Sequence, residues 1–275
     1  MPNADPYGRT DRLDDKLLEV LVTRLEARGK HPYFQKMMAD YLEAMRIDAA
    51  HSVLDMGCGT GVASRAIARR PGFRGHVTGI DLSPHLALVA TRLSAEEGLA
   101  PRVEFHAGDT SHLCIDSGTF DAVVAHTLVS HVDDPLAMLK EAARLVKPGG
   151  MVGVFDGDYA SITFSHPDAA QAKAHDEAII KSIVTNPRVM REMPQLLRAA
   201  GLSLVASFPY VLAEIGKADF WAPAIASLRR LAPAAGTMTE SAANELADNL
   251  MKASDEGVFF GASNYYGYVA RRERT

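Results

Sequence analysis

Short apolar segments alternate with longer amphipathic ones between residues 52 and 155, and this alternation constrains the fold more than any other feature of the chain. The apolar segments have the length of buried β-strands, and they occupy residues 52–56, 76–81, 103–106, 120–125 and 151–155. The stretches at 62–70, 84–97 and 135–146 carry helical patterns. Such alternation predicts an α/β fold in which helices cover both faces of a doubly wound, mostly parallel sheet.

The rest of the chain is predicted to be mainly helical. Amphipathic helices over residues 12–28 and 32–45 precede the sheet, so residues 1–48 are interpreted as an N-terminal helical lid and residues 49–275 as the core. Beyond residue 158, two more strands are expected at 202–208 and 264–270, among helices at 167–184, 187–200, 217–231 and 240–253. The helical segments at about 160–200 and 214–256 are expected to cover a substrate.

Local cap signals set two of these helix boundaries. Asn186 is expected to cap the helix over 187–200, which Gly201 then ends. Thr237 and Glu240 have the spacing of a capping box at the start of the helix over 240–253.

Composition excludes several classes of partner. The 275 residues contain 29 Lys and Arg against 34 Asp and Glu, a formal charge of −5, which does not suit nucleic acid or an anionic membrane. No apolar run approaches the roughly 18 residues of a membrane span, and the polar start does not suit a secretory signal. Two cysteines that are 56 residues apart, Cys58 and Cys114, suggest no disulfide framework, so a cytoplasmic location is expected. The oligomeric state is not readable.

The strongest site signal is the sequence VLDMGCGTG at residues 53–61, where a predicted strand enters a glycine-rich turn and then a helix. Glycines are required where the backbone takes a positive φ or where a ligand lies against the main chain. The spacing G-x-G-x-G differs from the G-x-G-x-x-G of dinucleotide-binding folds, because position 62 is Val. A nucleotide-like ligand other than a nicotinamide cofactor is therefore favoured, and an NAD-dependent oxidoreductase is kept as an alternative.

Two carboxylates follow the next two strands. Asp81 ends the strand after the glycine turn, where a carboxylate can accept both ribose hydroxyls and would repel a 2′-phosphate. Asp109 follows the third strand and can accept the exocyclic amine of an adenine. The alternatives are structural: Asp81 as a helix cap before Ser83, and Asp109 as a loop cap.

Five segments in a fixed order carry a resemblance to a known family. They are VLDMGCGTG, VTGIDLS, GDT, FDAVVAHTLVSHVDDP and RLVKPGG, and the resemblance that they carry covers roughly residues 52–155, with a weaker continuation to residue 270. In this order and spacing the chain resembles the class I S-adenosylmethionine-dependent methyltransferases, in particular the small-molecule branch that includes the quinone-biosynthesis enzymes.

The resemblance implies a Rossmann-like sheet of seven strands with the last one antiparallel, and a helical insertion before it. It implies S-adenosyl-L-methionine as cofactor, S-adenosyl-L-homocysteine as product, and no metal. The residues that it implies for cofactor binding are Asp55, Gly57, Cys58, Gly59, Gly61, Asp81, Leu82, Asp109, Thr110 and His126. Asp81 would hold the ribose, Leu82 would pack on the adenine, and His126 would lie near the methionine moiety through its backbone.

Methyl transfer from a sulfonium is an in-line displacement, which needs alignment and the exclusion of water, and a base only when the acceptor must lose a proton. His131 and Asp156 are the candidates for that base, because both follow strands at the edge where the cofactor is expected. A histidine oriented by a carboxylate suits deprotonation of a hydroxyl, so O-methylation of a small apolar or aromatic acceptor is favoured. Structural alternatives are His131 as a cap of the helix at 135 and Asp156 as a turn residue.

Other acceptor atoms and other activities stay open at this point. Carbon or nitrogen methylation of a quinone-like or other metabolite is the closest alternative. A protein of the same fold that binds the cofactor without methyl transfer, such as a regulator or a cyclase-like enzyme, would share every cofactor residue. Nucleic-acid methylation is disfavoured by the charge and by the absence of an Asn/Asp-Pro-Pro-Tyr/Phe motif.

Overall fold

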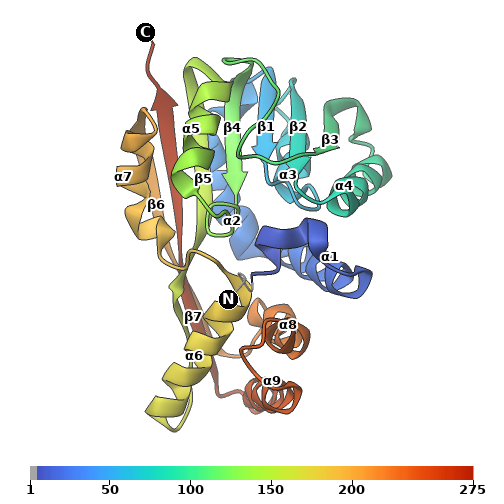
Figure 1. Cartoon of the computed structure of the whole chain (residues 1–275), viewed down its shortest axis with the longest axis vertical. Coiled ribbons are helices and arrows are strands. Elements are labelled where there is room, and N and C mark those ends of the chain that lie inside the picture. The colour runs from blue at the N-terminus through green and yellow to red at the C-terminus, as the bar shows by residue number, and fades with distance from the viewer. Residues whose placement is uncertain (1–4, 275) are drawn as a thin grey trace.

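A computed structural model describes residues 5–274 of the chain, and a seven-stranded sheet forms its centre (Figure 1). The strand order is β3-β2-β1-β4-β5-β7-β6. The strands are β1 (Ser52–Met56), β2 (His76–Asp81), β3 (Val103–Ala107), β4 (Phe120–His126), β5 (Val146–Phe164), β6 (Leu202–Gly216) and β7 (Phe259–Arg272).

The pairing of these strands confirms the predicted doubly wound, mostly parallel sheet. The first five strands pair in parallel, whereas β7 lies antiparallel between β5 and β6. From β1 the chain adds β2 and β3 on one side of the sheet, and it then returns to add β4 and β5 on the other side of β1. In such sheets ligands bind outside the carboxyl ends of the strands at this switch point. The ends of β1, β2 and β4 therefore mark the place to look for a site.

Helices surround the sheet as the alternation predicts. In chain order they are α1 (Asp15–Lys30), α2 (Pro32–Ala44), α3 (Val62–Ala68), α4 (Pro84–Glu96), α5 (Pro135–Leu145), α6 (Ala169–Ile183), α7 (Val189–Ala199), α8 (Trp221–Ala234) and α9 (Glu240–Asp255), with 3-10 turns η1 (Tyr7–Arg12), η2 (Ile47–Ala49) and η3 (Ala100–Arg102). One apolar core lies between the sheet and α2, α3 and the α8–α9 pair, and a second lies on the opposite face under α5 and α7.

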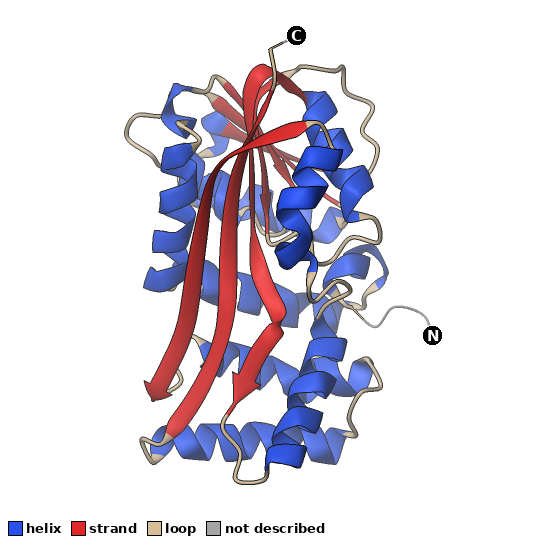
Figure 2. Ribbon diagram, turned by 90° about the vertical axis from the view of Figure 1, so that its left-hand side faces the viewer, coloured by secondary structure: helices blue, strands red, loops and turns tan. Residues whose placement is uncertain are grey.

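The last three strands are much longer than the sequence predicts. β5, β6 and β7 have 19, 15 and 14 residues, and Figure 2 shows them continuing past the end of the other strands. The extension was missed because the residues after Phe155 are mixed in polarity, and a register shift between Asp158 and Thr163 breaks the alternation. Helices α6, α8 and α9 pack together beside this extension, so the inserted helical segments form a layer beyond the parallel part of the sheet (Figure 1).

Two predicted helix caps are wrong. The N-cap of α7 is Arg188, and the Asn186 amide instead donates to the Val132 carbonyl over 2.6 Å, because the chain makes one more turn before the helix begins. The N-cap of α9 is Thr239, whose side chain accepts from Ala242 N, so Thr237 lies outside the helix. No helix among the described residues is both long and apolar enough to cross a membrane.

Candidate functional site

The turn between β1 and α3 favours glycine at its tightest point. Gly57 has a φ of 65°, and a Cβ there would lie 2.5 Å from Cδ1 of Leu128. The Cys58 amide donates to the Ile80 carbonyl over 3.0 Å, which fastens the turn to the neighbouring strand β2. Burial raises the pKa of the Cys58 thiol well above its usual range, so this cysteine is a packed thiol and not a reactive thiolate.

Asp81 at the end of β2 holds this turn from the other side. One carboxylate oxygen accepts from Gly59 N over 2.8 Å and the other from Ser83 N over 2.9 Å. Burial raises the pKa of the carboxyl, and these backbone donors and the Thr10 hydroxyl oppose that rise. Ser83 itself caps α4, so the predicted helix-cap role belongs to Ser83.

Two adjoining clefts meet at Gly57 and Asp81. One is narrow and runs along the glycine turn to the end of β4; the other has a volume of about 430 Å³ and opens between the ends of β2, β3 and β4. The first is lined by the predicted residues Asp55, Gly57, Cys58, Gly59, Asp81 and His126, and the second by Gly57, Asp81, Leu82, Asp109 and Thr110. Nine of the ten predicted cofactor residues therefore line this pair of clefts.

Gly61 is the exception. It lies behind the turn as the N-cap of α3 with a φ of 80°, and a Cβ there would lie 2.8 Å from Cζ of Phe105. Its requirement for glycine is thus explained by backbone conformation and helix packing. Asp109 lines the wider cleft but also accepts from Ser111 N over 2.8 Å, so the loop-capping alternative is observed alongside its place in the cleft.

Asp55 and Arg28 give the narrow cleft opposite charges. One Asp55 oxygen accepts from the Ser64 amide and hydroxyl over 3.0 and 2.6 Å, whereas the other is buried without a partner among residues 5–274. Burial raises the pKa of Asp55 to about 7. The Arg28 guanidinium donates to Thr127 Oγ1 over 2.8 Å and lies over the Phe34 ring at 4.9 Å.

This pair fits the amino-acid end of S-adenosylmethionine. An unpartnered carboxylate oxygen can accept from an ammonium, and a guanidinium without an ion-pair partner in the described chain can hold a carboxylate. Arg28 was not predicted from the sequence, because it follows an ordinary amphipathic pattern on α1 and has no motif around it.

His131 is held by a carboxylate, but not by the one expected. Its Nδ1 lies 2.9 Å from Oδ2 of Asp5, and both side chains are buried. Asp5 also accepts from Tyr7 N and from the Thr185 amide and hydroxyl, each over 2.9 Å. His131 lines both clefts, so the Asp5–His131 pair stands where the two join.

Asp156, the carboxylate expected beside His131, makes no hydrogen bond with it in the described part of the chain. The Asp156 carboxylate accepts from the Ser130 amide and hydroxyl over 3.1 and 2.8 Å and from Gly157 N over 2.8 Å. Burial raises the pKa of Asp156, although the His131 charge acts to lower it, and Asp156 lines neither cleft. Asp156 lies within β5, which pairs with β7 at this position, so it is not the turn residue of the structural alternative, and its carboxylate joins β5 to the segment after β4. Asp134, and not His131, caps α5.

His126 closes the inner end of the narrow cleft. Its ring stacks on Phe155 at 5.0 Å, and Nδ1 lies 3.0 Å from the Tyr41 hydroxyl. Burial lowers the pKa of His126 to about 3, with a smaller contribution from the Arg28 charge, so the imidazole is neutral near pH 7. Among the described residues no group of three or more His, Cys, Asp or Glu side chains could hold a metal ion.

Comparisons with known proteins agree with this geometry. Residues 53–150 match the family model described as a methyltransferase domain. An uncharacterised 37.1 kDa protein in transposon TN4556 of Streptomyces fradiae is 30% identical over 257 residues, which cover 92% of this chain and 70% of that protein.

Two further relatives are informative. A ubiquinone biosynthesis O-methyltransferase of Xanthomonas axonopodis pv. citri is 38% identical over 112 residues, 40% of this chain, and the match spans under half (45%) of that enzyme. Among solved structures, the [4+2]-cyclase SpnF aligns with a TM-score of 0.61 at 20% identity, over 90% of this chain and 85% of that one. At that identity the likeness supports the fold alone.

Proposed function

Because this chain belongs to the class I S-adenosylmethionine-dependent methyltransferases, we propose that it methylates a hydroxyl group of a small molecule, with His131 as the general base. The observation that carries the proposal is the Asp5–His131 contact of 2.9 Å at the junction of the two clefts. A buried histidine with a carboxylate behind it is an arrangement that accepts a proton from a hydroxyl.

The Asp5 contact supports Nε2 as the nitrogen of His131 that acts in this proposal. A carboxylate only accepts hydrogen bonds, so the proton of neutral His131 lies on Nδ1, which donates to Asp5. Nε2 then carries the lone pair and is the nitrogen that can take a proton from the acceptor. Asp5 also holds the imidazole ring in one orientation, because it is buried and bonded to Nδ1.

When bound, S-adenosylmethionine supplies the methyl group as a sulfonium. The chain's own contribution is to hold the two ends of that molecule apart and aligned: Asp81 for the ribose, Leu82, Asp109 and Thr110 for the adenine, and Asp55 with Arg28 for the amino-acid end. Effective molarities of about 10⁵ M or more are the usual gain from such alignment.

The N-terminal segment acts as the lid in this proposal. Tyr7 and Thr10 of η1 line both clefts, and Leu25 and Arg28 of α1 line the narrow one. The Thr10 hydroxyl also bonds the Asp81 carboxylate. A lid that touches the ribose-binding carboxylate can exclude water once the cofactor is present.

An apolar or aromatic acceptor suits the rings around His131. Tyr7 packs on the imidazole at 5.0 Å and Tyr159 contacts it edge-on at 5.9 Å. Phe220, at the start of α8, packs on Phe34 at 6.2 Å, so the inserted helices reach the lining of the site through this residue. Rings of this kind bury an aromatic acceptor with specific edge and face contacts.

The test has two stages. Calorimetry should first detect binding of S-adenosylhomocysteine. Methyl transfer from labelled S-adenosylmethionine is then measured over matched phenols, hydroquinones, enolisable diketones and amines. We expect products methylated at oxygen, formed by the wild type and lost in His131→Gln with cofactor affinity kept. Products methylated at carbon or nitrogen, or cofactor binding with no transfer to any compound, would reject the hydroxyl assignment.

A further inference from the structure

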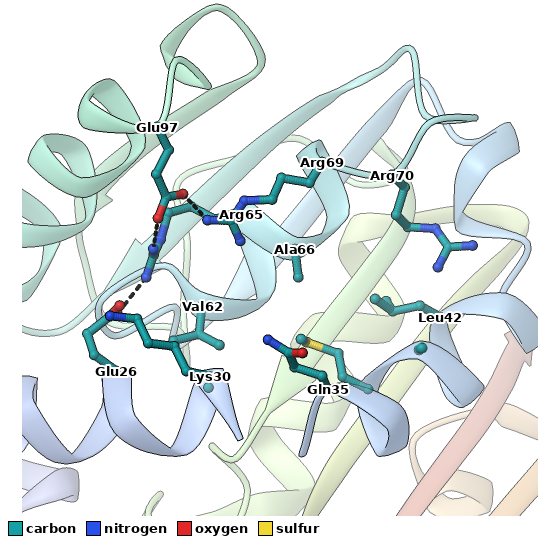
Figure 3. Close-up of a pocket in the computed structure, with 13 residues that line it drawn as sticks. Glu26, Lys30, Gln35, Leu42, Val62, Arg65, Ala66, Arg69, Arg70 and Glu97 are labelled. Carbon is teal, nitrogen blue, oxygen red and sulfur yellow. Dashed lines mark hydrogen bonds and ion pairs between the residues drawn. The ribbon is translucent and has the colours of Figure 1, made fainter. Parts of the chain in front are cut away.

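A separate cavity lies between α1, α2 and α3, outside the two clefts described above (Figure 3). Its volume is about 270 Å³. Gly29 and Val62 separate it from the narrow cleft, and they are in such close contact that a Cβ on Gly29 would lie 2.6 Å from Cγ1 of Val62. The cavity is therefore a compartment of its own behind the glycine turn.

The lining of this cavity divides into an apolar floor and a cationic rim. The floor is made by Met38 and Leu42 of α2 and by Val62 and Ala66 of α3. The rim carries Lys30, Arg69 and Arg70, as Figure 3 shows. A cleft with an apolar base and cations at the mouth matches a ligand that is itself apolar at one end and anionic at the other.

The rim has more positive charge than its carboxylates neutralise. Arg70 is paired with Asp48 at 2.5 Å and Arg69 with Glu97. Lys30 has no carboxylate within 4.0 Å among residues 5–274. One cation at the mouth is thus left for a ligand.

Buried Arg65 connects the cavity wall to the cofactor turn. Its guanidinium is paired with Glu26 of α1 and with Glu97 after α4, each at 2.5 Å. Its Nε is buried with no partner in the described part of the chain. Glu26 also accepts from the hydroxyl of Thr60, inside the glycine turn, over 2.6 Å. Because Glu26 contacts both Arg65 and Thr60, a shift of α1 relative to α3 would also move the hydrogen-bond partner of Thr60.

We propose that this α1–α2–α3 cavity binds a small amphipathic carboxylate, with its head group on Lys30 and its tail on the apolar floor. The volume is just below the roughly 300–1,000 Å³ of drug-sized ligand pockets, so the tail is a short alkyl or aryl group. Such a ligand bridges the end of α1 to α3. It should therefore stabilise the Glu26–Thr60 contact and increase affinity for the cofactor.

Octanoate is a direct probe of this site. The control 1-octanol has the same tail without a charge, and the control octylamine has the same tail with a positive charge. Binding is followed by titration of the full-length protein labelled at its methionine methyl groups, in which the Met38 signal reports on the floor. Lys30→Gln should weaken octanoate binding by about three- to fivefold, the scale of one exposed ion pair. Ala66→Trp should fill the cavity and abolish binding. Lys16→Gln, on the exposed part of α1, is the matched control and should change nothing.

The outcomes separate the site from the coupling and from the proposed activity. Octanoate binding with weaker octanol and octylamine binding supports the site, whatever the acceptor proves to be. Equal binding of octanol, no saturable binding of octanoate, or binding unaffected by both Lys30→Gln and Ala66→Trp would overturn it. Tighter S-adenosylhomocysteine binding with octanoate present supports the coupling, and an unchanged affinity would refute that part.

Discussion

The Nδ1 atom of His131 lies 2.9 Å from the carboxylate of Asp5, although the two residues are 126 positions apart in the chain. The contact brings the N-terminal segment against the loop that follows β4, at the point where both clefts meet. A base that depends on this segment is complete only when the segment is in place. Closure of the lid and readiness for proton transfer are therefore coupled in the proposed mechanism.

Asp5→Asn tests this coupling. An amide placed at Asp5 can donate to Nδ1, which would move the imidazole proton to Nε2 and leave no lone pair toward the acceptor. We expect kcat to fall by about 10²-fold or more, within the 10²–10⁴ that a positioned general base supplies. Affinity for S-adenosylhomocysteine should change little, as measured by calorimetry. Asp11→Asn, an exposed change in the same segment, is the control. Full turnover in Asp5→Asn would remove the pair from the mechanism.

Asp156→Asn is expected to act on stability and not on chemistry. The carboxylate accepts three hydrogen bonds that join Ser130 and Gly157, and an amide oxygen can replace only part of them. The free energy of unfolding should fall by about 1–3 kcal/mol. Urea titration followed by fluorescence of Trp221, the single tryptophan, measures it. A large loss of turnover in fully folded protein would instead restore Asp156 as a catalytic candidate.

Asp5 and Asp156 show why the sequence predicted part of the candidate site and missed the rest. The glycine turn, Asp81 and Asp109 were predictable because ligand-binding residues follow strands in a parallel sheet. Asp156 also follows a predicted strand at 151–155, but β5 continues past it, and the partner of its carboxylate depends on packing between β5 and the segment after β4. Asp5 and Arg28 lie before the sheet, and only tertiary folding brings them to the strand ends.

In the fold, too, local pattern predicts some elements whereas tertiary pairing decides others. Alternation of apolar and amphipathic segments was enough for the parallel sheet, since the central strands β1 and β4 are almost entirely buried and mostly apolar. The extensions of β5, β6 and β7 were missed because they include exposed residues such as Val211 and Ile215 beside buried ones such as Leu212. Their pairing is decided by partner strands far along the chain, which local pattern does not contain.

Asp81→Ala should weaken binding of S-adenosylhomocysteine by about 1–3 kcal/mol, the cost of leaving buried hydrogen-bonding partners unpaired. Calorimetry gives the affinity, and a thermal melt without ligand gives the cost to the fold. Asp109→Ala is the comparison: its carboxylate bonds Ser111 N at an exposed position, so its loss should be smaller. Equal losses in both variants would contradict the assignment of the ribose to Asp81.

His126 should make the fold sensitive to acid. Its pKa is about 3 in the folded protein and about 6.5 in the unfolded chain, so protons bind preferentially to the unfolded state between these values. The stability that this group contributes is present above pH 6.5 and is lost as the pH falls. Between pH 7 and pH 5 the wild type should lose about 2 kcal/mol more than His126→Phe. Urea titrations of both proteins at the two pH values measure the difference, and equal losses would argue against a buried neutral His126.

Asp55 should make cofactor binding depend on pH. Burial raises the pKa of this carboxyl to about 7, and its unpartnered oxygen can accept from the ammonium of the cofactor only when the group is ionised. Below pH 7 binding must first remove a proton, so the affinity for S-adenosylhomocysteine should fall roughly tenfold from pH 8 to pH 6.

Asp55→Asn separates this effect from other titrating groups. The amide keeps an acceptor for Ser64 but has no charge to titrate, so its affinity should be lower at pH 8 and nearly level down to pH 6. Calorimetry in buffers of different ionisation enthalpy should also show that the wild type releases protons when it binds S-adenosylhomocysteine near pH 6.5. The Asp55→Asn variant should release fewer protons than the wild type. If both proteins lost affinity in parallel as the pH fell, the titrating group would be another one, and the raised pKa of Asp81 makes that carboxyl the next to test.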